Sequence, residues 1–136
     1  MPQKEQQKNK IIEFQILKQE IQKLQEQMQN INNNVQELQI LNNTMEELEN
    51  VKENHEILIP LGQGIFTKGN IKNSNEVIAN VGSNIFVEKN LKETKEMVKL
   101  NILNLSKALE RSEEEINQNI EKLQELQKEI MQQEKQ

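Results

Sequence analysis

The distribution of glycine and proline constrains the fold of this 136-residue chain more than any other sequence feature. Residues 3–52 and 83–136 contain neither residue type, whereas all four glycines and one of the two prolines lie between Pro60 and Gly82. Because glycine and proline interrupt regular structure, long stretches without them favour long helices. The sequence therefore predicts a helix at about 3–52, a β-rich or irregular middle at about 56–88, and a helix at about 89–131.

Apolar residues recur in both helical segments at steps of three and four, the a/d spacing of a coiled coil. In the first segment they are Phe14, Leu17, Ile21, Leu24, Met28, Ile31, Val35, Leu38, Leu41, Met45 and Leu48. The step from Leu38 to Leu41 is the second consecutive step of three residues, and this predicts a local overwinding of the coil. In the second segment they are Leu91, Thr94, Val98, Ile102, Leu105, Leu109, Ser112, Ile116, Ile120, Leu123, Leu126 and Ile130.

The two apolar series are compatible with an antiparallel pairing of the helices. In such a hairpin, residues at one height have numbers with a constant sum, and pairs such as Phe14 with Leu126 and Leu38 with Ile102 give about 140. The pairing predicts a polar layer, Met28 opposite Ser112. Only 34% of the residues are hydrophobic, which suits a narrow apolar seam better than a thick core. We expect one domain over residues 1–136, an α+β fold in which a long coiled-coil hairpin of helices carries two β-hairpins at its bend.

Composition argues against several classes of function. The net charge of −5 and the 2% aromatic content disfavour nucleic-acid binding. Cysteine is absent, no apolar run is long enough to span a membrane, and the N-terminus lacks a signal-peptide pattern, so we expect a cytoplasmic protein. His55 is the only histidine, which leaves it without a catalytic or metal-ligating partner. We expect no enzymatic activity, no cofactor and no metal.

The middle segment predicts four short strands that form two β-hairpins. Apolar β-formers alternate with three turn-forming clusters that begin at Gly62, Asn73 and Gly82. Pro60 cannot donate to a strand ladder, so the first strand should lie at an edge or contain a bulge. Such short strands leave edges whose unpaired N–H and C=O groups can pair with strands of another chain. We therefore expect the apolar residues of this segment to mediate subunit assembly: Ile57, Ile59, Leu61, Ile65, Phe66, Val77, Val81, Ile85 and Val87.

The middle segment also resembles a known family. The stretch ILIPLGQGIFTKGNIK, followed by EVIANVGSNIFVEK and a helix, resembles the double-hairpin signature of prefoldin alpha subunits. The strongest matches are Ile59-Pro60-Leu61-Gly62 and Val81-Gly82 followed by Val87-Glu88-Lys89, while Asn80 and Asn84 stand where glycine and a small residue are more usual. Because beta-type subunits carry one hairpin, two hairpins favour the alpha type.

The resemblance implies a function and a set of partners. It implies a subunit of the hetero-hexameric prefoldin co-chaperone, assembled from beta-type subunits and a second alpha-type subunit. Such a complex holds unfolded client proteins at coiled-coil tips and passes them to a group II chaperonin without ATP. An alternative is a prefoldin-like scaffold subunit of another multiprotein assembly.

The ends of both helices carry more apolar residues than a seam requires. These candidate client-binding residues are Ile11, Ile12, Phe14, Leu126, Ile130 and Met131. They are either seam residues of a fraying coil end or an exposed apolar surface that binds unfolded segments. The family resemblance favours the second interpretation, and isoleucine and methionine side chains suit promiscuous contacts.

Overall fold

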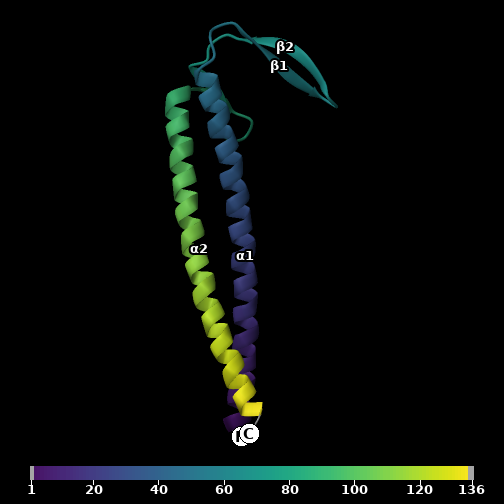
Figure 1. The fold of residues 1–136 in the computed structure, drawn as a ribbon, viewed down its shortest axis with the longest axis vertical. Helices are drawn as coiled ribbons and strands as arrows, with labels where there is room; N and C mark the ends of the chain where they lie inside the picture. The colour runs from purple at the N-terminus through teal and green to yellow at the C-terminus, as the bar shows by residue number, and fades with distance from the viewer. Residues whose placement is uncertain (1, 135–136) are drawn as a thin grey trace. The chain divides into compact units, whose positions relative to one another are not determined.

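The computed structural model describes residues 2–134 and the side chains of residues 4–133; Met1, Lys135 and Gln136 of the expected domain lie outside the described residues. Two long helices, α1 (Pro2–Glu49) and α2 (Leu91–Glu134), flank four strands in the chain (Figure 1). The strands are β1 (His55–Gly62), β2 (Ile65–Ile71), β3 (Glu76–Asn80) and β4 (Phe86–Asn90). The predicted α+β fold of two long helices with two β-hairpins between them is confirmed.

The chain divides into two compact units, and the division falls inside both helices. Unit 1 comprises Met1–Val35 and Asn104–Gln136, and unit 2 comprises Gln36–Leu103. Unit 1 therefore consists of paired helical segments, whereas unit 2 contains the remaining helical segments and all four strands.

In unit 1 the buried side chains follow the coiled-coil spacing. Ile21 and Val35 of α1 and Ile116 and Asn119 of α2 are buried, and half-buried apolar residues continue the series between them. An ion pair between Lys10 and Glu129, with 3.4 Å between Nζ and Oε2, links the two helices. Most side chains between these seam residues are exposed, as expected for a chain with few apolar residues.

The seam differs from the expected series at Leu41. Leu41 is 43% exposed, and the neighbouring Asn42 is half-buried instead. Asn42 continues the alternation of steps through Val35, Leu38 and Met45, so the seam accepts a polar residue here. Two consecutive steps of three fall instead at Met45 and Leu48. The Asn42 Oδ1 atom is shielded from solvent and has no hydrogen-bond partner among the described residues.

α2 also has polar residues at seam positions where apolar residues were expected. Asn119 is buried to 8% exposure, whereas the expected seam residue Ile120 is only half-buried. Near the start of α2, Lys95 is half-buried alongside Thr94. With Lys95 and Asn119 included, the seam of α2 alternates steps of four and three from Leu91 to Ile130, and regular helix geometry therefore outweighs side-chain polarity in setting which residues face the partner helix.

Unit 2 has a small hydrophobic core of its own. Met45 of α1 and Leu91 and Val98 of α2 are buried together. Partly buried residues packed against this cluster are Leu38, Leu48, Val77 and Ile102. Val77 lies in β3, so this hairpin contributes a side chain to the helical core.

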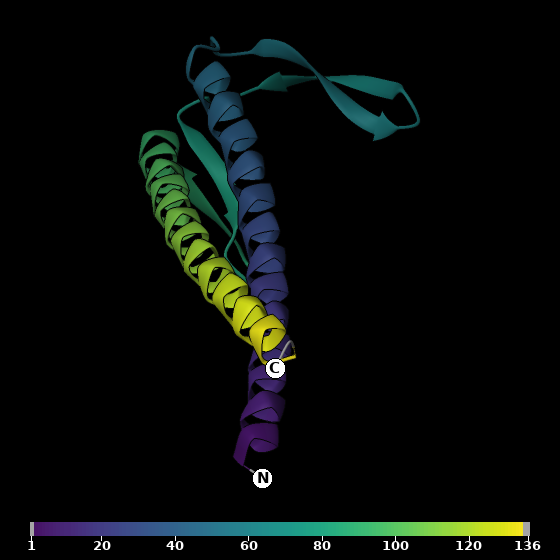
Figure 2. The same ribbon diagram turned by 60° about the horizontal axis from the view of Figure 1, so that its bottom comes forward.

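The four strands form two separate antiparallel sheets of two strands each (Figure 2). β1 pairs with β2 from His55↔Ile71 to Pro60↔Phe66, and the register then shifts before Gly62↔Ile65. The shift leaves Leu61 unpaired, so the predicted bulge beside Pro60 is confirmed. β3 pairs with β4 from Glu76↔Asn90 to Asn80↔Phe86 without interruption.

Short polar contacts define where the helices meet the strands. Asn90 caps α2, because its Oδ1 accepts a hydrogen bond from the Glu93 backbone N–H at 3.1 Å. The Leu91 N–H donates to the Asn75 carbonyl at 2.8 Å, which ties the start of α2 to the residue before β3. α1 ends at Glu49, and Asn54 then takes a positive φ of 62° before β1, a conformation that asparagine tolerates.

Candidate functional site

Both hairpins turn at two consecutive residues with positive φ, within a two-residue connection (63–64) between β1 and β2 and a five-residue connection (81–85) between β3 and β4. Gln63 and Gly64, with φ of 53° and 79°, connect β1 to β2. Ser83 and Asn84, with φ of 49° and 59°, occupy the equivalent positions of the β3–β4 connection, where the Ile85 N–H donates to the Gly82 carbonyl at 2.9 Å. Positive φ at both central residues is the type I′ pattern, which is favoured in hairpins.

The Asn80 side chain supports the second turn. Its Oδ1 accepts a hydrogen bond from the Gly82 backbone N–H at 3.0 Å, so a polar side chain fixes the chain direction at the strand end. Asn84 is a residue type that tolerates positive φ. The two asparagines that depart from the usual family pattern are therefore accommodated in a regular register.

The β1–β2 hairpin exposes apolar side chains on both of its faces. Ile57 and Ile59 lie on one face, opposite Gly69 and Thr67 in the register. A Cβ added to Gly69 would lie 2.6 Å from Ile59 Cδ1, so glycine provides the space in which the Ile59 side chain rests. Leu58, Pro60 and Phe66 lie on the other face; Leu58 and Phe66 are exposed, and an ion pair from Lys68 to Glu56 at 3.5 Å crosses the strands there.

The β3–β4 hairpin has one face turned to the helical core and one face turned to solvent. Val77 and Ala79 are half-buried, whereas Ile78 between them is 69% exposed. Phe86, which pairs with Asn80, lies on the same exposed face as Ile78. The exposed face therefore carries an isoleucine and a phenylalanine that no described side chain covers.

The structure does not gather the nine expected assembly residues onto one surface. Exposed in this chain are Ile59, Leu61, Ile65, Phe66, Val81, Ile85 and Val87. Ile57 and Val77 are half-buried, and Val77 packs inside the chain. Sequence reasoning missed Leu58, Ile78 and Phe86, although strict alternation along each strand would have assigned them to the opposite face.

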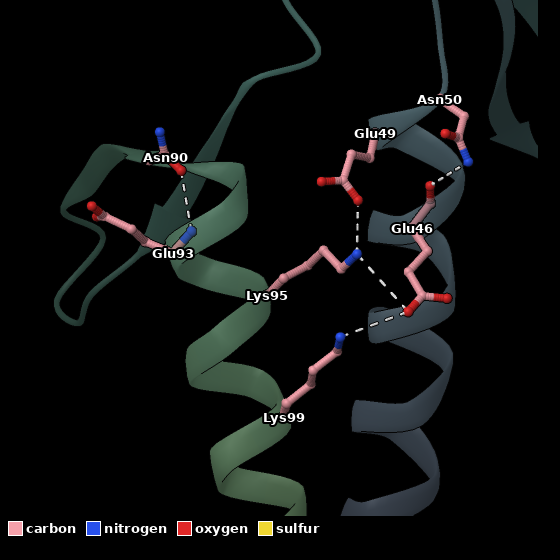
Figure 3. A network of polar contacts seen from close by, with 7 residues as sticks. All are labelled: Glu46, Glu49, Asn50, Asn90, Glu93, Lys95 and Lys99. Atoms are coloured by element: carbon pink, nitrogen blue, oxygen red, sulfur yellow. Dashed lines mark hydrogen bonds and ion pairs between the residues drawn. The ribbon is translucent and has the colours of Figure 1, made fainter.

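An ion-pair network joins α1 and α2 in unit 2 (Figure 3). Lys95, whose side chain is 12% exposed, donates to Glu49 Oε2 at 2.8 Å and lies 3.9 Å from Glu46 Oε1. Lys99 lies 4.0 Å from the same Glu46 oxygen. The hydrogen bond from Lys95 and its positive charge lower the pKa of the Glu49 carboxyl below its ordinary value. The last turn of α1 contains no basic residue, so Lys95 also supplies the positive charge that a helix C-terminus favours.

The ends of the helical segments in unit 1, residues 10–18 and 122–131, form two apolar grooves; we call this region the tip. The first groove, of about 380 Å³, has an apolar floor and three carboxylates at its rim, and we call it the acidic groove. It is lined by Glu13, Ile16, Leu17, Lys122, Glu125, Leu126 and Glu129.

The second groove of the tip, of about 370 Å³, has no carboxylate in its lining, and we call it the lysine-rimmed groove. It is lined by Ile11, Phe14, Gln15, Lys18, Gln127, Ile130 and Met131. Of the six expected client-binding residues, the structure brings four together here, places Leu126 in the acidic groove, and leaves Ile12 exposed outside both. Sequence reasoning missed the charged rims, which only the side-by-side placement of the helices reveals.

Further exposed apolar residues lie on the helices of unit 2. Met97, Leu100 and Leu103 of α2 and Ile40 of α1 are each at least half exposed. They occupy positions outside the a/d seam, where polar residues are usual. Neither described helix contains a stretch that is long and apolar enough to cross a membrane. Among residues 2–134, histidine and carboxylate side chains do not gather into a metal-binding group.

Comparisons with known proteins agree with this architecture. A family model described as "Prefoldin subunit" matches residues 17–136. The chain is also similar to a solved structure described as a cryo-EM structure of filamentous PFD from Methanocaldococcus jannaschii, with a TM-score of 0.70 and 19% sequence identity. That alignment covers 90% of this chain and 98% of the other chain. No curated protein sequence matches significantly.

Proposed function

The chain belongs to the prefoldin family, and from this premise we propose that it is an alpha-type subunit of a hetero-hexameric prefoldin co-chaperone in the cytoplasm. In this proposal it assembles with beta-type subunits and a second alpha-type subunit. The complex holds unfolded client proteins and passes them to a group II chaperonin without ATP. Proteins of this family are chaperone-type scaffolds, and we propose no catalytic role.

The observation that carries the proposal is the pair of β-hairpins with uncovered apolar faces. A two-stranded hairpin is marginally stable alone, and each of its strands is an edge. Exposed side chains such as Leu58, Phe66, Ile78 and Phe86 add apolar area that a partner could cover. Two such hairpins in one chain favour the alpha type over a subunit with a single hairpin.

The tip supports the client-holding part of the proposal. Its two grooves combine half-buried floor residues, such as Leu17 and Phe14, with exposed Ile16 and Met131. Unfolded proteins expose apolar segments, and shallow grooves with flexible apolar side chains can bind many such segments weakly.

Reconstitution with a beta-type subunit tests the proposal. Co-expression should give a complex whose native mass equals a hexamer with two alpha-type chains. This complex should also suppress light scattering when a denatured client is diluted into buffer. A chain that remains a well-behaved monomer in the presence of beta-type subunits would contradict the assembly proposal, and a hexamer that leaves scattering unchanged would contradict the holding activity.

A second candidate is a scaffold formed in another assembly, including an assembly of this chain alone. The description of the similar archaeal structure as filamentous favours this alternative specifically. Open strand edges pair with other chains, including copies of the same chain, which is a route to self-assembly. Negative-stain images of the isolated chain separate the two candidates: filaments would support the alternative, and small species that become hexamers on adding the beta-type subunit would support the co-chaperone.

A further inference from the structure

The two grooves of the tip differ in charge although their floors are alike. The rim of the acidic groove carries Glu13, Glu125 and Glu129 against one lysine, Lys122. The lysine-rimmed groove carries Lys18 as its one charged side chain, with the amides of Gln15 and Gln127 beside it. An apolar segment entering either groove therefore meets a different electrostatic environment.

Two of the three rim carboxylates are available to a ligand. Glu129 is paired with Lys10 at 3.4 Å. Among the described residues, Glu13 and Glu125 take part in no ion pair. They come from different helices, Glu13 from α1 and Glu125 from α2, and both border the floor formed by Leu17 and Leu126.

We propose that the acidic groove selects unfolded segments in which apolar residues are flanked by lysine or arginine. The inference rests on the proposed client-binding function and names the chemistry of the clients that this groove takes. The apolar floor binds the apolar centre of the segment, and Glu13 and Glu125 pair with its flanking cations. Repulsion by the same carboxylates disfavours segments flanked by aspartate or glutamate, so charge gives selectivity where apolar contact alone gives none.

The expected preference is modest because the rim is exposed. Each exposed ion pair changes affinity by roughly 1.5- to 5-fold, so two pairs should favour a lysine-flanked segment by roughly 2- to 25-fold, with about 5-fold near the middle of that range. Salt should reduce this preference, because exposed charges are screened within about 10 Å at ordinary ionic strength.

Two fluorescent peptides of equal length measure the preference on the assembled complex. Both have the same apolar centre, and one is flanked by lysines and the other by glutamates. Fluorescence anisotropy at low salt should show about 5-fold tighter binding of the lysine-flanked peptide, and high salt should reduce the difference. In the double variant Glu13→Gln with Glu125→Gln, the two peptides should bind almost equally.

A matched variant separates local charge from net charge. Glu26→Gln with Glu121→Gln removes the same charge from exposed positions of α1 and α2 that line neither groove, and should keep the preference. Ile16→Ser, in the acidic groove, should weaken the lysine-flanked peptide more than Met131→Ser, in the lysine-rimmed groove. Circular dichroism checks that each variant keeps its helix content.

The outcomes distinguish this inference from the function on which it rests. Equal binding of both peptides, or a preference that survives Glu13→Gln with Glu125→Gln, would overturn charge selection while leaving client binding intact. Failure of the complex to bind either peptide or to hold a denatured client would instead overturn client binding itself.

Discussion

The two β-hairpins share an antiparallel two-stranded topology but differ in how the rest of the chain supports them. The β3–β4 hairpin places Val77 against the core of Met45, Leu91 and Val98, and Asn75 accepts a hydrogen bond from the first residue of α2. The β1–β2 hairpin lacks a comparable residue in that core and exposes apolar side chains on both faces. One hairpin is therefore partly stabilised within the chain, whereas the other depends on what covers it.

The largest difference should appear in assembly. Ile59→Asp with Phe66→Asp places a charge on each face of β1–β2 and should abolish hexamer formation, because partner contacts would bury an unpaired charge. The helix content and thermal stability of the isolated chain should change little, since both side chains are exposed. Native mass spectrometry and circular dichroism measure the two effects. Loss of helix in this variant would show that β1–β2 supports the coil and would end the distinction between the hairpins.

A smaller effect, on the free energy of unfolding, should differ between two neighbouring residues of β3. Val77→Asp should lower the free energy of unfolding by about 2 kcal/mol, because it inserts a charge into the core of unit 2. Ile78→Asp, the next residue on the exposed face, should change it by less than about 0.5 kcal/mol. Urea denaturation followed by circular dichroism measures both values. Equal losses would mean that β3 does not hold one face against the helices.

Substitutions in the two turns test the same difference between the hairpins. Ser83→Asn with Asn84→Gly gives β3–β4 the favoured type I′ dipeptide and should raise the free energy of unfolding by about 0.5–1 kcal/mol. Gln63→Asn makes the same improvement at the first turn position of β1–β2. It should slow amide exchange within that hairpin while leaving the melting temperature unchanged, because β1–β2 contributes little to the helical core. A higher melting temperature from Gln63→Asn would contradict this independence.

The smallest effect concerns the end of α1 that leads into β1. Lys95 lowers the pKa of Glu49, so the folded chain binds a proton at this carboxyl less readily than the unfolded chain. The resulting stability is present above the ordinary value of 4.5 and is lost as pH falls through the lowered pKa. Glu49→Gln should therefore lower the melting temperature slightly at neutral pH, and this difference should shrink as the pH falls below 4.5. Glu47→Gln, an exposed neighbour outside the ion pairs among described residues, is the control and should show no such pH dependence.

The fold was predictable because its main signals are local. The positions of glycine and proline indicated that the non-helical part lies in the middle of the chain, and the a/d spacing identified both helices. The bulge beside Pro60 followed from its missing N–H donor. The polar seam residues were not predictable from hydrophobicity, because Asn42, Lys95 and Asn119 lie in the seam by helix geometry and Leu41 and Ile120 stand beside them.

The candidate surfaces were less predictable than the fold. Apolar character located the strands, but the assignment of Val77 to assembly overlooked that one face of β3 packs against helices distant in sequence. At the tip, Phe14 and Ile130 were identified by spacing alone. The charge difference between the grooves depends on Glu13 and Glu125 meeting across two helices, which a single helical pattern does not specify.

Because the seam residues recur in heptads, the coil can be lengthened or shortened by one heptad at a time. Removing residues 22–28 from α1 and 112–118 from α2 would delete one heptad from each helix at the same height and keep every other seam residue in phase. Each such unit shortens a helix by about 10 Å. A change in one helix alone would shift one set of seam partners by a full heptad, so insertions and deletions in the two halves of the sequence are constrained to occur as pairs. Paired changes of one heptad therefore alter the length of the coil while the residues at either end keep their seam partners.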